Sequence, residues 1–233
     1  MALPFFFLNQ YQGEDRIQLD EANSRHMVAV LRMQPGEELL LTDGKGHLLQ
    51  CRISEAHKKK AVVDLLKREE QPRRPKHCTI AISPVKNNAR FEWFLEKATE
   101  IGVSAIIPLL TQRTEKQQFR HERMQQILIS ALLQSQQVWL PELSHPVRFA
   151  DLIKEDSYSQ KWIAHCLDTG RVSLRDQAGA GSNQLLLIGP EGDFTPQEIQ
   201  LAMEAGFEPV TLGDTRLRTE TAGLVGATLL CVS

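Results

Sequence analysis

Apolar and polar residues alternate in two different ways along this chain, and the change falls near residue 71. Before it, short apolar runs are separated by turn residues, a pattern typical of a small β-rich module. Asp43-Gly44-Lys45-Gly46 is a strong hairpin signal within this module. The strands that the pattern predicts cover residues 5–8, 38–42, 47–53 and 60–66.

A short helix is predicted between the first two of these strands. Asp20 is expected to cap it, and it is expected to end near Leu31. Met27, Val30 and Leu31 follow helical spacing, so we expect them on its inner side.

Residues 67–77 contain two prolines and no apolar residue, which indicates a linker. We therefore expect two domains, residues 1–71 and 72–233. In the second domain, strand and helix patterns alternate, which predicts an α/β fold with a parallel sheet of about five strands or more. The predicted strands are 78–82, 105–110 (interrupted by Pro108), 162–166, 185–188 and 209–212, and a glycine-rich loop is expected at Gly179-Ala180-Gly181. The predicted helices cover 91–101, 124–135, 196–205 and 221–231.

The segment that starts at Leu185 has the pattern of a strand, a tight turn and a helix. Residues 185–188 are apolar, Gly189-Pro190-Glu191-Gly192 forms the turn, and residues 195–198 match a capping box. Ligands of open α/β sheets bind where strands end and helices begin. Taken alone, however, such a glycine turn is more often only a turn.

A second segment repeats this arrangement about 25 residues later. After the strand at 209–212, Gly213-Asp214 turns the chain, and Thr219 or Thr221 can cap the last helix. The intervening residues 216–221 are too polar for a core and would normally form a solvated loop. Two such segments, each following a strand, together favour one shared ligand site.

The last predicted helix is apolar on nearly all sides. Such a helix is buried, in part against another subunit if the chain forms an oligomer. Gly223 and Gly226 would let another backbone approach closely.

These two segments resemble the signature of a known family. Ile188–Gly192, and Leu212-Gly213 followed by Leu217–Ala222, are similar to the motifs of the ribosomal RNA small-subunit methyltransferase E family, in the SPOUT class of S-adenosylmethionine-dependent enzymes. The resemblance implies a C-terminal trefoil knot that holds the cofactor. It also implies an N-terminal PUA-like β-barrel that binds RNA, because residues 25–36 and 43–46 match that domain.

The resemblance implies methyl transfer from S-adenosyl-L-methionine to N3 of a uridine in the decoding region of 16S ribosomal RNA. The expected partners are this RNA or the small ribosomal subunit, and a second copy of the chain in a homodimer. The implied cofactor-binding residues are Leu187, Ile188, Gly189, Pro190, Glu191, Gly192, Leu212, Gly213, Leu217, Arg218, Thr219, Thr221 and Ala222.

Two of the motif residues are predicted to act in catalysis. Arg218 would orient the uracil or a phosphate as a bidentate donor. Glu220 is either a helix-terminal charge stabilised by the helix dipole, which we favour, or a proton acceptor.

The predicted RNA-binding residues are Arg25, Arg32, Lys86 and Arg113, which match the family pattern. Lys58-Lys59-Lys60 is either a phosphate contact or a solvated basic face. Lys97 and Glu100 belong to another matched segment, but their spacing also suits a simple i,i+3 ion pair.

The chain departs from the family at two positions of the long helix. Leu133 replaces an acidic residue and Gln137 replaces an arginine, so the contact that those residues make in the family is in doubt here.

Composition limits the remaining possibilities. A formal net charge of −2 means that any RNA site must be a local basic patch. The four cysteines and seven histidines lack metal-ligand spacing, so we expect buried thiols and no metal site. The absence of a signal peptide or a long apolar segment predicts a cytoplasmic protein that does not bind membranes.

Two other functions fit the same pattern. The chain could be an RNA-binding or ribosome-assembly module that keeps the fold without turnover. A small-molecule α/β enzyme is disfavoured, because the N-terminal module would then have no role.

Overall fold

The computed structural model describes residues 3–115, 118–167, 170–177 and 183–232. The chain divides into two compact units. Unit 1 contains residues 1–73 and 132–140, and unit 2 contains residues 74–131 and 141–233.

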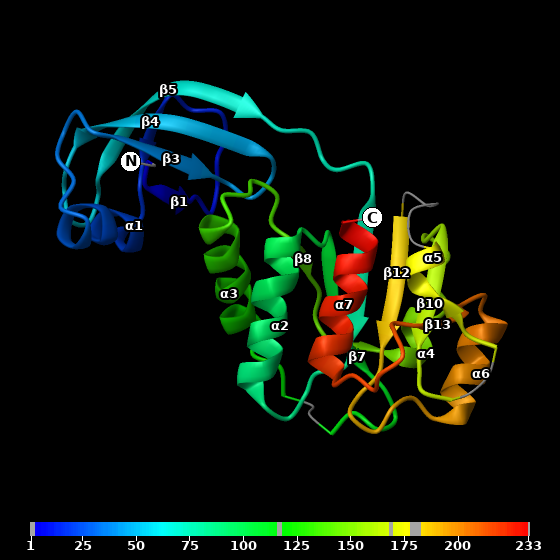
Figure 1. Ribbon diagram of the computed structural model, residues 1–233. Coiled ribbons are helices and arrows are strands. Elements are labelled where there is room, and N and C mark those ends of the chain that lie inside the picture. The colour runs from blue at the N-terminus through cyan, green and yellow to red at the C-terminus, as the bar shows by residue number, and fades with distance from the viewer. Residues whose placement is uncertain (1–2, 116–117, 168–169, 178–182, 233) are drawn as a thin grey trace. The chain divides into compact units, whose positions relative to one another are not determined.

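Unit 1 is built on a five-stranded sheet with the strand order β1-β3-β4-β5-β2 (Figure 1). The strands are β1 (Phe5–Phe7), β2 (Arg16–Gln18), β3 (Glu38–Thr42), β4 (His47–Glu55) and β5 (Val62–Glu70). The predicted hairpin is confirmed, because β3 and β4 are antiparallel across residues 43–46. Gly44 and Gly46 have φ angles of 71° and 101°, a region that favours glycine.

The helix in unit 1 differs from its prediction. Asp20 caps α1 (Glu21–Arg25) as expected, but a π-helical segment, η1 (His26–Val30), follows it. Met27 is buried, whereas Val30 and Leu31 are 65% and 44% exposed, so their predicted inner placement is wrong. A π-turn adds a residue per turn and therefore rotates the following side chains away from the face that a regular helix would give them.

The predicted linker is also wrong in part. Strand β5 continues to Glu70, where it pairs with His47 of β4, so only residues 71–76 connect it to the next strand. The side chains of residues 67–70 are exposed, and their backbone pairs with residues 47–50 of β4. A polar composition therefore does not distinguish this solvent-facing strand from a linker.

Unit 2 contains an eight-stranded sheet in which all the neighbouring strands are parallel, which confirms the predicted α/β class. The order is β11-β13-β10-β12-β6-β7-β8, and β9 also pairs with β7. The strands are β6 (His77–Ile82), β7 (Ala105–Leu110), β8 (Glu142–Leu143), β9 (Val147–Arg148), β10 (Gln160–Ala164), β11 (Val172–Ser173), β12 (Asn183–Ile188) and β13 (Glu208–Thr211). Pro108 lies within β7 opposite Ile82 and does not interrupt the strand, contrary to the prediction.

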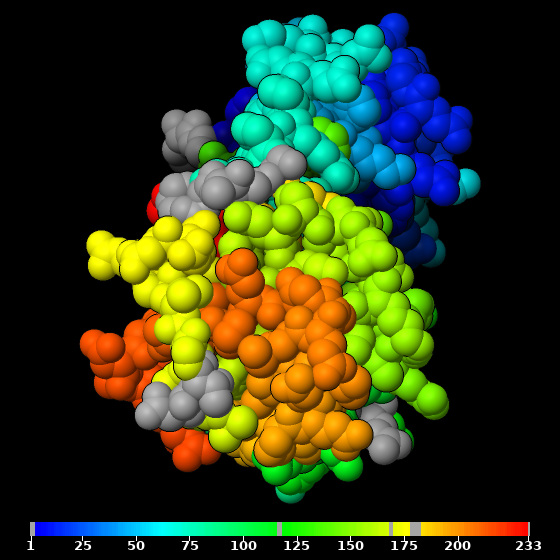
Figure 2. Space-filling model, turned by 90° about the vertical axis from the view of Figure 1, so that its right-hand side faces the viewer, coloured from blue at the N-terminus to red at the C-terminus, as the bar shows by residue number. Residues whose placement is uncertain are grey.

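The helices of the chain beyond residue 73 are α2 (Asn88–Ile101), α3 (His121–Gln134), α4 (Phe149–Leu152), α5 (Leu174–Gln177), α6 (Pro196–Glu204) and α7 (Thr219–Cys231). Helix α2 ends at Gly102 as predicted, and the capping box of α6 is present with Thr195 and Glu198 in the predicted roles. Helix α6 lies at the surface of unit 2, shown in orange in Figure 2. The predicted glycine loop at 179–181 lies outside the described residues.

Helices cover both faces of the central strands, which is why these strands are continuously apolar. Helix α7 packs on β6, β12 and α2 (Figure 1). On the opposite face, Leu185 and Leu187 of β12 belong to a buried cluster with residues of α4 and α6. Gly223 and Gly226 do permit close packing of α7, although the groups that approach them are side chains rather than the backbone expected.

Candidate active site

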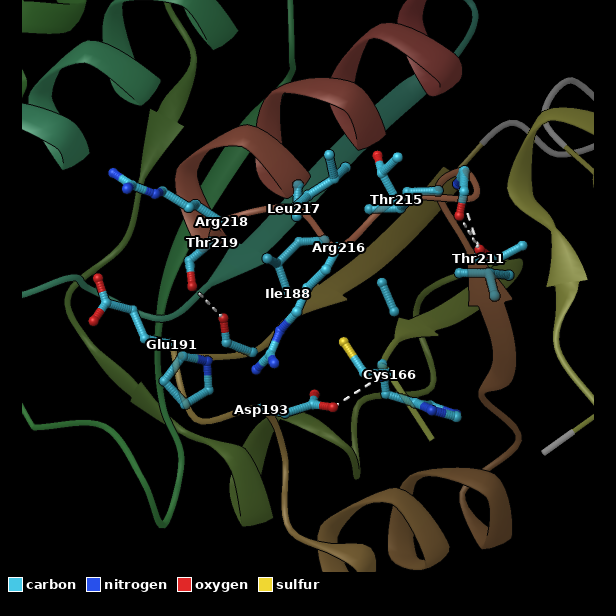
Figure 3. Close-up of a pocket in the computed structure, with 18 of the residues that line it drawn as sticks. Cys166, Ile188, Glu191, Asp193, Thr211, Thr215, Arg216, Leu217, Arg218 and Thr219 are labelled. Atoms are coloured by element: carbon cyan, nitrogen blue, oxygen red, sulfur yellow. Dashed lines mark hydrogen bonds between the residues drawn. The ribbon is translucent and has the colours of Figure 1, made fainter. Parts of the chain in front are cut away.

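A cavity of about 500 Å³ opens at the carboxyl ends of β10, β12 and β13, which are neighbours in the sheet. Figure 3 shows the two sequence segments meeting there, with the turn after β12 facing the loop that enters α7. The predicted residues that line the cavity are Ile188, Gly189, Pro190, Glu191, Leu212, Gly213, Leu217, Arg218, Thr219 and Ala222. The size and the position are those of a small-molecule site at the carboxyl edge of an open α/β sheet.

Three predicted cofactor residues lie behind this lining. Leu187 points into the core on the other face of the sheet. The Gly192 carbonyl oxygen accepts a hydrogen bond from Arg113 Nη1 at 2.5 Å, and Thr221 is half-buried in the first turn of α7. Their predicted roles in cofactor binding stay predictions.

A buried hydrogen bond joins the two segments. Thr219 Oγ1 donates to the Gly189 carbonyl oxygen at 3.1 Å (Figure 3). Helix α7 begins at Thr219, and Arg218 at the N-cap position makes no side-chain capping bond within the described residues. The prediction that Thr219 or Thr221 caps this helix is therefore wrong, because the helix starts earlier and the Thr219 hydroxyl binds the other segment.

Replacing Thr219 by valine should weaken both the fold and the site. Valine keeps the shape but leaves the buried Gly189 carbonyl without its donor, which costs about 1–3 kcal/mol. We expect this loss in chemical denaturation. Thr228→Val is the matched control, because that hydroxyl bonds within α7 on its exposed side and should change stability by about 0.5 kcal/mol or less. Equal stability of the two variants would contradict a linking role for Thr219.

Sequence reasoning missed Asp193, which ties the turn after β12 to the loop after β10. Its φ angle is 63°, a left-handed conformation that aspartate tolerates better than most residues. One carboxylate oxygen accepts from the Phe194 backbone N–H at 2.8 Å. The other accepts from the Cys166 backbone N–H, also at 2.8 Å (Figure 3). The only local signal for it was an aspartate directly after a glycine turn.

The loop after β10 supplies further lining that the sequence did not indicate. His165 is 5% exposed, and neither ring nitrogen has a partner in hydrogen-bonding geometry among the described residues. Burial lowers the pKa of this imidazole, as does the nearby Arg171 cation, while the Asp193 carboxylate and the Leu167 backbone oppose the shift. Other lining residues not predicted are Arg90, Ala164, Cys166, Arg171, Val210, Thr211, Thr215 and Arg216.

Glu220 lies beside the cavity in the first turn of α7. It is 6% exposed, its Oε1 lies 3.7 Å from Arg90 Nε, and its Oε2 has no hydrogen-bond partner among the described residues. Arg90 Nη1 also lies 3.6 Å from Glu191 Oε1. The helix N-terminus and the neighbouring Arg90 cation both stabilise the negative charge of Glu220, as expected for a structural role. It also leaves one oxygen able to accept a proton or a hydrogen bond.

The predicted RNA-binding cations have different surroundings. Arg25 and Arg32 are exposed in unit 1, and Arg113 in unit 2 is exposed but braces Gly192. Lys86 pairs with Glu115, whose hydrogen bond raises the pKa of the lysine. Their contacts with RNA stay predictions.

The alternative prediction, that Lys97 forms an i,i+3 ion pair with Glu100, is confirmed. Lys97 Nζ lies 2.9 Å from Glu100 and 2.7 Å from Glu96. At one of the positions that depart from the family, Gln137 donates a hydrogen bond to Ser135.

All four cysteines are free thiols, and Cys166 is exposed rather than buried. Within the described ranges, the His, Cys, Asp and Glu side chains form no group that could hold a metal ion. Helices in the same ranges are all too short or too polar to cross a membrane.

Two family models match the chain. The RNA methyltransferase domain matches residues 72–231, and the RNA methyltransferase PUA domain matches residues 19–66. Among curated proteins, the ribosomal RNA small subunit methyltransferase E of Synechocystis is 31% identical, over 91% of this chain and 71% of its own length. The protein of the same name from Aquifex aeolicus is 28% identical, over 93% and 94% of the two chains.

Solved structures agree with these matches. A probable rRNA methyltransferase from Porphyromonas gingivalis superposes with a TM-score of 0.90 at 37% identity, covering 99% of both chains. The ribosomal RNA small subunit methyltransferase E of Neisseria gonorrhoeae, bound to S-adenosyl methionine, superposes with a TM-score of 0.87 at 31% identity, covering 97% of this chain and 96% of the other.

Proposed function

The chain belongs to the ribosomal RNA small subunit methyltransferase E family of RNA methyltransferases, and from this premise we propose that it methylates N3 of a specific uridine in the decoding region of 16S ribosomal RNA, using S-adenosyl-L-methionine. The cavity at the carboxyl ends of three parallel strands carries this proposal. It is large enough for a nucleoside-sized ligand, and the buried, unpartnered imidazole of His165 in its wall is a group that such a ligand would satisfy.

The residues of the two motif segments would hold the cofactor. Ile188, Gly189, Leu212, Gly213 and Leu217 line the cavity and can offer backbone groups to the adenosine part. When bound, S-adenosylmethionine supplies an activated methyl group: its carbon–sulfur bond breaks with the electron pair on sulfur, N3 bonds to the methyl carbon, and N3 releases its proton. A metal is not needed for this step, because the donor already carries a good leaving group.

The chain must then orient the uracil and accept the proton. Arg218 is exposed on the rim of the cavity, where its guanidinium can bind the uracil oxygens or a phosphate in a bidentate manner. Glu220 and Arg90 lie together beside the rim. We favour the structural role for Glu220, whose negative charge Arg90 stabilises. The alternative is that Glu220 accepts the proton through its Oε2, which has no hydrogen-bond partner among the described residues.

RNA binding is proposed for residues 1–71 and methyl transfer for residues 72–233. Arg25 and Arg32 would contact phosphates in the first part, and Lys86 and Arg113 in the second. Half-buried Leu224, Val225 and Leu229 of α7 support a homodimer in which this helix meets a second copy. We expect the protein in the cytoplasm, where small ribosomal subunits are.

The alternative is a binding or assembly module of the same fold that does not turn over. To decide between them, small subunits that lack the modification would be incubated with the protein and S-adenosylmethionine. Methylation at N3 blocks Watson–Crick pairing, so we expect a reverse-transcription stop at one uridine and 3-methyluridine in the nucleoside digest.

The controls are the same reaction with S-adenosylhomocysteine and with free 16S RNA. Binding of subunits without any methylated nucleoside would favour the assembly module. Methylation of a different atom or base would overturn the N3 assignment while keeping the methyltransferase.

A further inference from the structure

His165 lines the cavity with a buried polar side chain that makes no hydrogen bond to the described part of the chain. It follows β10, the middle one of the three strands that end at the cavity, and its side chain is 5% exposed. Neither ring nitrogen has a partner in good hydrogen-bond geometry among the described residues, although the Leu167 backbone lies near enough to raise the pKa of the ring. Leaving a buried polar group unpaired is unfavourable, so its presence here calls for a partner that binds.

Two hydrogen bonds hold the backbone around His165. Its carbonyl oxygen accepts from Arg171 Nη1 at 2.9 Å, and the next residue, Cys166, donates its backbone N–H to Asp193. These two bonds hold the loop after β10 from both sides. A residue fixed in this way can select a ligand with little ordering cost.

The imidazole is suited to an uncharged, hydrogen-bonding ligand group. Burial lowers its pKa, so near neutral pH the ring is neutral and presents one donor and one acceptor. Ribose hydroxyls and the edge of adenine also combine donors and acceptors. A protonated ring would instead repel the positive sulfonium of the cofactor.

The charged ends of the cofactor have other groups available. Arg90 Nη1 and Glu191 Oε1 lie 3.6 Å apart where the turn after β12 meets α7, and Figure 3 shows Glu191 on the side of the cavity away from Cys166 and Thr211. The wall next to His165 is formed by Ala164 and by Val210. The Asp193 carboxylate and the Arg171 cation also lie near the imidazole, but they are opposite in sign and each bonds to the backbone of the loop after β10, so this part of the wall carries no net charge.

We propose that His165 is a cofactor-positioning residue that hydrogen-bonds the adenosine part of S-adenosylmethionine. This inference rests on the proposed function, because it takes the cavity to be the cofactor site. It assigns a role to a residue outside both motif segments.

Binding calorimetry with two probes tests it. S-adenosylhomocysteine has the adenosine and the amino-acid part, whereas 5′-methylthioadenosine has only the adenosine part. For His165→Phe, which replaces the imidazole by an aromatic ring without nitrogens, we expect about tenfold weaker binding of both probes by the same factor. His165→Asn, which restores a donor and an acceptor, should recover part of the loss. His57→Phe, at an exposed site in unit 1, is the matched control and should bind like wild type.

The outcomes separate this inference from the proposed function. Wild-type protein that binds neither probe would overturn both. If the wild type binds the probes and His165→Phe binds them equally well, only the role of His165 is overturned. The same holds if His165→Phe loses affinity for S-adenosylhomocysteine but not for 5′-methylthioadenosine. If His165→Phe does not fold, His165→Ala and His165→Asn replace it, and equal affinities of these two variants for 5′-methylthioadenosine would overturn the hydrogen bond.

Discussion

Replacing Arg218 by alanine is expected to slow methylation by about 10²–10³-fold, while cofactor affinity stays within a few-fold of wild type. Arg218 is exposed at the rim of the cavity, so its guanidinium is free to face the RNA rather than the core. Its structural contribution comes from the backbone, because its carbonyl oxygen accepts the Ala222 N–H at 2.7 Å and alanine keeps that bond. The loss should therefore lie in turnover and not in folding.

The measurement is single-turnover methylation of small subunits at saturating protein, together with calorimetry for S-adenosylhomocysteine. Arg218→Lys keeps the charge but loses the planar fork, so we expect only partial recovery. Arg175→Ala, at an exposed position of α5, should be as active as wild type. Full turnover by Arg218→Ala would remove this residue from the proposed mechanism. Retained RNA binding with lost methylation would show that the protein is an enzyme and not only a binding module.

Replacing Gly223 by valine is expected to destabilise the protein by about 3 kcal/mol, the upper part of the range for overpacked cores. A Cβ at this position would lie 2.6 Å from Ile82 Cδ1 and 2.8 Å from Phe94 Cε2, so α7 could not keep its contact with β6 and α2. At a helix position with free space around it, replacing a glycine would instead increase the stability of the protein by about 0.5–1 kcal/mol. The sign of the change thus reports on the packing.

The effect should appear as a fall of roughly 6–12 °C in the melting temperature, at about 2–4 °C per kcal/mol for a chain of this size. Thr228→Val introduces the same side chain on the exposed side of α7 and should leave the melting temperature nearly unchanged. Because α7 carries Thr219 and Arg218 at its start, a tilted helix should also weaken cofactor binding. Wild-type stability of Gly223→Val would mean that α7 packs more loosely than described.

Much of unit 2 could be predicted because the signals lie within a few residues of one another. The capping box of α6 depends on residues 195–198 alone, and the continuous apolar run at 185–188 reports a strand covered on both faces. The hairpin at 43–46 has the same local character. The two motif segments could be assigned to one site because each follows a strand of a parallel sheet, whose carboxyl ends share an edge.

Other features depended on contacts between residues far apart in the chain. The hydroxyl of Thr219 binds Gly189 rather than capping its own helix, which no local pattern distinguishes. The π-turn that exposes Val30 and the pairing that extends β5 to Glu70 likewise follow from neighbours in space.

His165 shows most clearly the difference between what the sequence predicts and what the tertiary structure decides. In the sequence it is a histidine after an apolar run, and only the pairing of β10 with β12 and β13 places it in the cavity wall. Its burial and its unpartnered nitrogens are properties of that assembled wall. Sequence patterns report the interactions of a residue with its near neighbours in the chain, whereas the surroundings of a buried polar group are set by elements that meet only in the folded protein.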